Sequence, residues 1–178
     1  MTRRRGAFYD QAGMSLVELV VASAVTVIIL AGVSALFAQG LRAQATTVDG
    51  DTATGRTEVV AQSLEQSLRN ARKATVSADG RSLAAEVLDA GGWTCRRWSL
   101  KVAGDPLKNS LEYTAKGKTT VLATGVADVA GGVFGPTSST LDFGGRVSYH
   151  LQIAIKQTEA TATGAVLLQA AGSGGGSC

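Results

Sequence analysis

The sequence predicts an α+β fold in which a long N-terminal helix, membrane-spanning in its first half, packs through its second half on an antiparallel β-sheet. Two patterns support this prediction. The apolar residues gather near the N-terminus, where 19 of the 25 residues from Met14 to Ala38 are apolar. From residue 74 onward apolar and polar residues alternate, which is the period of a half-buried strand.

Composition narrows the functional class. The chain has 178 residues and is 45% hydrophobic, which is too apolar for a disordered chain. Two cysteines exclude a disulfide-dense scaffold and a four-cysteine zinc site, and a single histidine excludes a His-rich metal site. The acidic residues are scattered singly, and no P-loop, nucleophile elbow or H-E-x-x-H motif occurs. We therefore expect no enzyme, metal or cofactor, and interpret His150 as an exposed strand residue.

The apolar segment is long enough to cross a membrane. A helix of 25 residues spans roughly 37 Å, against about 30 Å for the hydrocarbon core. Arg3, Arg4 and Arg5 precede the segment, and the next basic residue is Arg42. The positive-inside rule places the arginines in the cytoplasm. The sequence therefore predicts a single-pass cytoplasmic membrane protein whose globular part lies outside.

Glu18 interrupts the apolar segment near its start. A carboxylate at the centre of a membrane helix costs about 2.5–3.5 kcal/mol on insertion scales, and less near the surface, so it marks a functional residue. If the chain is cut after Gly13, the new amine of Met14 lies one helical turn from Glu18. The amine and the carboxylate can then neutralise each other, within one chain or between axially shifted copies.

Residues 13–22, with the sequence GMSLVELVVA, resemble the cleavage and methylation motif of type IV prepilins and pseudopilins. The resemblance implies a prepilin peptidase that removes the leader 1–13 by cutting after Gly13 and then N-methylates Met14. It also implies that Glu18 pairs with the N-terminal amine of a neighbouring subunit in a cell-surface filament. The chain departs from the family in having Met14, where phenylalanine is usual, and in lacking a basic residue beside Gly13.

Residues 39–73 are expected to form a polar bend followed by an amphipathic helix. Gly50 and Gly55 each weaken a helix by about 1 kcal/mol, which favours a break or bend near 50–55. One apolar stripe then follows with helical spacing. Its members are Val60, Leu64, Leu68 and Ala71. The helix is expected to end near Lys73.

Residues 74–171 are predicted to form the sheet. Two segments alternate apolar residues with polar neighbours and are predicted as strands. The first has Trp98, Leu100 and Val102 on its apolar face, and the second has Val147, Tyr149, Leu151, Ile153 and Ile155. Gly144-Gly145 predicts a hairpin that joins the second strand to a partner at 140–143. Further strands are expected near 82–88, 109–115, 119–123 and 164–170. The pilin resemblance implies the same architecture, and residues 98–100, 111–113 and 121–126 weakly resemble minor pilins and pseudopilins of the J/W-like group.

Two cysteines remain, Cys95 in a strand-like segment and Cys178 after the Gly/Ser tail that starts at residue 172. An extracellular compartment permits disulfides, and the glycine tail has the reach to bring the two together. Pilins often fasten their C-terminal region with a disulfide, so the resemblance favours this pairing. Two free thiols remain the alternative.

These observations predict a structural filament subunit, more a minor pilin or pseudopilin than a major one, which assembles with other subunits through residues 14–38. Ala43-Gln44-Ala45 leaves open a secretory signal with cleavage before Thr46, and hence a secreted or anchored binding protein that does not polymerise. The net charge of +3 falls to +1 without the leader, which argues against nucleic acid as a partner. Motility, DNA uptake, secretion and adhesion are not separated by the sequence.

Overall fold

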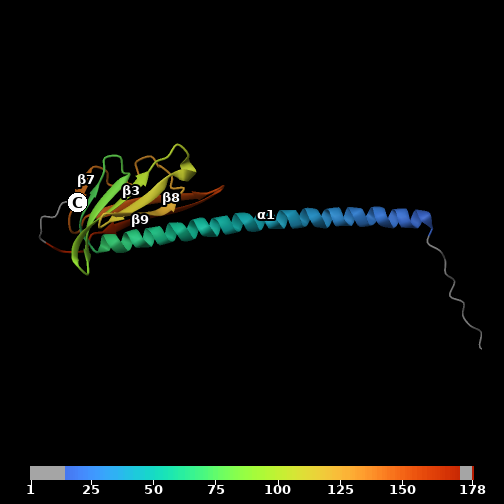
Figure 1. Ribbon diagram of the computed structural model, residues 1–178, viewed down its shortest axis with the longest axis horizontal. Coiled ribbons are helices and arrows are strands. Elements are labelled where there is room, and N and C mark those ends of the chain that lie inside the picture. The colour runs from blue at the N-terminus through green and yellow to red at the C-terminus, as the bar shows by residue number, and fades with distance from the viewer. Residues whose placement is uncertain (1–14, 173–177) are drawn as a thin grey trace, which may run out of the picture. The chain divides into compact units, whose positions relative to one another are not determined.

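A computed structural model describes residues 15–172 and Cys178, and Figure 1 shows its elements. The predicted leader 1–13, the predicted cleavage residues Gly13 and Met14, and residues 173–177 of the tail lie outside the described residues. The chain divides into two compact units, Met1–Gln44 and Ala45–Cys178. The second unit contains every strand of the described residues and is called the globular unit below.

One helix, α1, runs without interruption over Leu16–Arg69. The break or bend expected near 50–55 is therefore wrong, and the helix ends at Arg69 instead of near Lys73. The glycines are tolerated because a break costs two new helix ends and a second nucleation. Tertiary contacts also hold this stretch, since Ala53 is fully buried and Gly50 lies close to Thr158.

The buried face of α1 lies in the globular unit. Its buried residues are Ala53, Thr57, Val60, Ala61, Leu64, Ser67 and Leu68. The predicted apolar stripe is confirmed, although its last member, Ala71, belongs to the first strand. Thr57 is accommodated because its hydroxyl donates a hydrogen bond of 2.8 Å to the carbonyl of Ala53.

Within the described residues, nine strands form two antiparallel sheets. They are β1 Ala71–Val76, β2 Ser82–Asp89, β3 Gly92–Lys101, β4 Ser110–Ala115, β5 Lys118–Thr124, β6 Phe134–Gly135, β7 Ser139–Leu141, β8 Arg146–Ile155 and β9 Thr158–Leu167. A single 3₁₀ turn, Pro106–Lys108, precedes β4. The larger sheet has the order β5-β4-β3-β2-β1-β7, and the smaller one the order β6-β8-β9. In Figure 1 the labelled strands lie beside the C-terminal end of α1.

Most predicted strands are confirmed within a few residues. Trp98, Leu100 and the first four apolar residues of β8 are buried, whereas Val102 lies beyond the end of β3 and is exposed. The strand expected at 164–170 begins six residues earlier, at Thr158. Its threonine- and alanine-rich first half lies at an edge of the smaller sheet, so it lacks the apolar run by which a buried strand is identified.

The predicted hairpin across Gly144-Gly145 is wrong. The turn exists, because the N–H of Gly145 donates to the carbonyl of Asp142 at 2.8 Å. However, β7 pairs with β1, and β8 pairs with β6 and β9. The residue after β9 bonds to the turn instead. The N–H of Gly144 donates to the carbonyl of Leu168 at 2.9 Å, and the N–H of Leu168 donates to the carbonyl of Gly145 at 3.0 Å. The turn therefore passes the chain from one sheet to the other.

The two sheets and the buried face of α1 enclose one hydrophobic core. Its largest fully buried side chains include Trp98, Phe134, Leu64, Leu68 and Leu151, which come from α1 and from both sheets. The predicted α+β fold, with a long N-terminal helix and antiparallel sheets, is confirmed.

Candidate assembly helix and its attachment to the globular unit

The first part of α1 exposes a large apolar surface. It includes Leu16, Val17, Leu19, Val20, Val21, Val25, Val27, Ile28, Ile29, Leu30, Val33, Leu36, Phe37 and Leu41. The helix is long and apolar enough to cross a membrane, and none of its most apolar window is buried. An exposed apolar surface of this extent is normal only where lipid or another protein covers it.

Two hydroxyls within this surface are already satisfied by the helix itself. Ser23 donates to the carbonyl of Val20, and Thr26 to that of Ala22, each at 2.8 Å. Such bonds let a hydroxyl lie in a lipid-facing or helix-packed surface without an unmet donor. They leave Glu18 as the charged group of this segment.

Glu18 lies in the first turn of α1 and its side chain is exposed. Its backbone N–H donates to the carbonyl of Ser15 at 2.9 Å, so the residue is fixed in helical geometry. Within residues 15–172 its carboxylate has no hydrogen bond or ion pair. The helix dipole favours a carboxylate in the first turn. The carboxylate can still form an ion pair with a cationic group.

Further along, Gly40 forms a notch in the helix surface. The notch is lined by Leu36, Phe37, Leu41 and Gln44. A Cβ added to Gly40 would meet no atom within 4 Å, so nothing within the chain's described part requires a glycine here. Small residues let a second helix approach closely, and this position therefore suits helix–helix packing.

In the globular unit, α1 is attached by a hydrogen bond from Tyr149 of β8. The Tyr149 hydroxyl donates to Oε1 of Glu65 at 2.5 Å, and Arg69 pairs with Oε2 at 3.3 Å. Burial, with the bond to Glu65 as the second cause, raises the pKa of Tyr149 to about 12. The tyrosine is thus neutral at physiological pH and acts as a donor to the helix.

Gly164 of β9 makes this bond possible. The Tyr149 ring crosses over it, and a Cβ at Gly164 would lie 2.4 Å from the hydroxyl oxygen and 2.5 Å from Cζ. Gly164 is the register partner of Tyr149 across the β8–β9 pair. A glycine inside a strand commonly marks such a close approach. Gly164 is therefore the one sign in the sequence of the contact between Tyr149 and α1, which the sequence analysis did not predict.

A second attachment lies where α1 enters the globular unit. Nζ of Lys156 lies 3.0 and 2.9 Å from the two carboxylate oxygens of Asp49. Lys156 occupies the β8–β9 turn with a positive φ of 53°. Non-glycine residues rarely adopt this conformation, and the side chain of Lys156 reaches α1 from this turn. Sequence reasoning missed this pair because its members are 107 residues apart.

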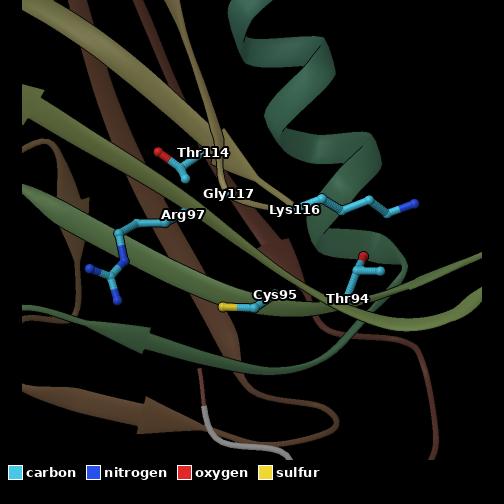
Figure 2. Close-up of a pocket in the computed structure, with 6 residues that line it drawn as sticks. All are labelled: Thr94, Cys95, Arg97, Thr114, Lys116 and Gly117. Carbon is cyan, nitrogen blue, oxygen red and sulfur yellow. The ribbon is translucent and has the colours of Figure 1, made fainter.

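The structure joins Cys95 and Cys178 in a disulfide with a Cα–Cα distance of 5.5 Å. Cys95 also lines a pocket of about 440 Å³ on β3 and β4. Figure 2 shows the charged ends of Arg97 and Lys116 pointing in opposite directions there, so they do not converge on a ligand. Among the described residues, no three potential metal ligands lie together, and His150 is exposed.

Comparison with known proteins adds one match. The family model for the prokaryotic N-terminal methylation motif matches residues 9–34, which include Gly13, Met14 and Glu18. No curated protein and no solved structure matches the chain. The chain therefore carries the N-terminal signal of the type IV prepilin and pseudopilin family, followed by an exposed apolar helix and an α+β globular unit.

Proposed function

We propose that this protein is a structural subunit, a minor pilin or pseudopilin, of a type IV pilus or a type II secretion-like filament. The observation that supports this most is the coincidence of the methylation motif with Glu18 in an exposed apolar helix, where its carboxylate has no partner among residues 15–172. An anchor needs only the apolar surface. The carboxylate adds a charged group at one fixed point of that surface, and the N-terminal amine of a neighbouring subunit can form an ion pair with it there.

The proposed sequence of events follows from the chemistry of the helix. Prepilin peptidase cuts after Gly13 and methylates Met14, while the apolar residues hold the subunit in the cytoplasmic membrane. Assembly then exchanges lipid contacts for helix–helix packing, which small residues such as Gly40 permit. The amine of a neighbouring Met14 relieves the cost of the Glu18 carboxylate in an apolar environment and thereby sets the axial position of each subunit.

Replacing Glu18 by alanine tests this proposal. The Glu18→Ala protein is expected to insert into the membrane normally but to be lost from sheared filaments, measured by immunoblotting of membrane and filament fractions. Glu58→Ala provides the matched control, because Glu58 is an exposed glutamate on the same helix outside the motif. Normal incorporation of Glu18→Ala would refute the assembly role of the carboxylate.

The alternative is a secreted or anchored binding protein that does not polymerise. It requires either cleavage before Thr46 or an uncut N-terminus. A Gly13→Ala substitution distinguishes the two proposals, because it is expected to block processing by a prepilin peptidase and to leave a signal peptidase cut after Ala45 unchanged. A mature chain that begins at Thr46 in both proteins, or a wild-type protein of full-length mass, would therefore favour the alternative.

A further inference from the structure

The side of α1 that faces away from the core has a regular pattern of uncharged residues within the globular unit. They recur at alternating intervals of three and four residues and all of them are exposed: Ala45, Val48, Thr52, Gly55, Val59, Gln62 and Gln66. This is the spacing of the a and d positions of a coiled-coil heptad. The buried residues of α1 named above fall at the b, c and f positions of the same heptad, which lie on the opposite side of the helix. The uncharged residues are called the outer seam below.

The outer seam has the properties of a helix contact that its own chain leaves open. Val48 and Val59 are 61% and 67% exposed. The Thr52 hydroxyl donates to the carbonyl of Val48 at 2.7 Å, so covering it would leave no unmet donor. Gly55, between the two valines, weakens the helix, and a Cβ added to it would meet no atom within 4 Å among the described residues. Glycine permits another backbone to approach closely, which gives this exposed residue a physical reason.

Charged residues on both sides of the outer seam indicate which partner fits it. The g positions are all acidic, namely Asp51, Glu58 and Glu65, whereas Arg56 occupies an e position. In a parallel, in-register pair of helices each g position faces the e position five residues later in the partner, so Asp51 faces Arg56 of a second copy. Within the described part of its own chain, neither of these two exposed residues has an ion pair or a hydrogen bond. An antiparallel pair would instead bring the acidic g positions together, which like-charge repulsion disfavours.

We propose that the outer seam binds the outer seam of a second copy of this chain, parallel and in register, while one membrane holds both copies. Two Asp51–Arg56 ion pairs, one on each side, then fix the register. The two valines are the only large apolar residues of the seam, so pairing depends on the high local concentration that a shared membrane provides, and dilute detergent separates the copies. The contact is distinct from the proposed filament contact, in which Glu18 meets Met14 of an axially shifted copy. It rests on the membrane attachment of the subunit and not on filament formation.

Cysteine cross-linking in intact membranes tests the proposal. Residues with the same number face each other only when two copies are in register, so a Val59→Cys chain should form a covalent dimer when copper phenanthroline is added. The native cysteines are bonded to each other, which leaves the new thiol free to react. Thr54→Cys is the matched control, because Thr54 is exposed on α1 at a c position, and it should give a several-fold lower yield of dimer. Equal yields from the two variants would overturn the proposal.

Two further variants of the Val59→Cys chain test its register and its independence from the filament. Arg56→Asp places acidic residues opposite each other and should lower the dimer yield about threefold, and adding Asp51→Arg should restore it, because the ion pairs then form with reversed charges. A double variant that stays as low as Arg56→Asp alone would contradict the in-register pairing. Glu18→Ala should leave the yield unchanged even if filaments are lost, and a loss of dimer in that background would assign the cross-link to the filament contact and overturn the separate seam.

Discussion

The replacement of Gly164 by alanine should loosen the attachment of α1 to the smaller sheet. The new methyl group would lie 2.4 Å from the Tyr149 hydroxyl oxygen and 2.5 to 2.7 Å from two ring carbons. Carbon atoms in contact prefer a separation of about 3.5–4.0 Å, so the ring has to move by about 1 Å. A movement of that size breaks the 2.5 Å hydrogen bond to Glu65.

The expected cost combines two effects. Overpacking of a filled site costs about 1–3 kcal/mol, and loss of a hydrogen bond to a charged group about 1.5–3 kcal/mol. The two overlap, because a ring that moves away relieves the clash while it loses the bond. We therefore expect Gly164→Ala to lower the free energy of unfolding by about 3 kcal/mol.

Denaturant unfolding of the full-length protein in detergent, followed by tryptophan fluorescence, measures this cost. Gly104→Ala is the matched control, because a Cβ at Gly104 would meet no atom within 4 Å and the residue has no positive φ. In a Tyr149→Ala background, Gly164→Ala should be neutral or slightly stabilising, since the clashing ring is absent. A similar cost in both backgrounds would refute the assignment of the glycine to the tyrosine contact.

Three further predictions concern the globular unit. The pKa of Tyr149 is about 12 in the folded state and about 10 when unfolded, so the unfolded state loses the proton first as the pH rises. The free energy of unfolding, measured by denaturation at each pH, should therefore fall by about 3 kcal/mol between pH 10 and pH 12. The Tyr149→Phe protein should lack this loss. Asp49→Asn should cost about 0.2–1 kcal/mol at low ionic strength and nothing in high salt, since it removes an exposed ion pair with Lys156; an equal cost at both salt concentrations would contradict this. Leu64 is 1% exposed, so Leu64→Ala should lower the free energy of unfolding by about 2–5 kcal/mol in denaturant melts. Val59 is 67% exposed, so Val59→Ala should change it by no more than about 0.5 kcal/mol. Comparable costs for the two variants would contradict the orientation of α1.

Local patterns predicted which segments form helix and strand better than they predicted where each element goes. The stripe from Val60 to Leu68 and the alternation in β8 were predicted correctly, because a buried face imposes its period on the sequence. The hairpin at Gly144-Gly145 was wrong because a two-glycine turn specifies a reversal of the chain and not the strand that pairs. Its pairing depended on β1 and β9, which are distant in sequence.

The continuous helix through Gly50 and Gly55 shows a different limit. Their propensity cost is local and visible in the sequence, whereas the contacts that offset it are not. Asp49 is held by Lys156, and Gly50 lies against Thr158, more than a hundred residues later. Helix propensity is a weak prior, and tertiary packing routinely overrides it.

The assembly segment was the part most open to prediction from the sequence. The family motif places Gly13, Met14 and Glu18 at fixed spacing in the sequence, so predicting them needs no tertiary structure. The attachment of α1 through Glu65, Tyr149 and Gly164 could not be predicted in the same way, because it joins three distant segments.

The most direct test of the central claim is the intact mass of the mature protein purified from membranes or filaments. A filament subunit of the proposed kind should begin at Met14 and carry one methyl group on its N-terminal amine, so its mass should exceed that of the unmodified chain from Met14 by one CH2 group. The full-length mass, or a chain that begins at Thr46, would contradict processing as a prepilin and with it the proposed assembly through Glu18.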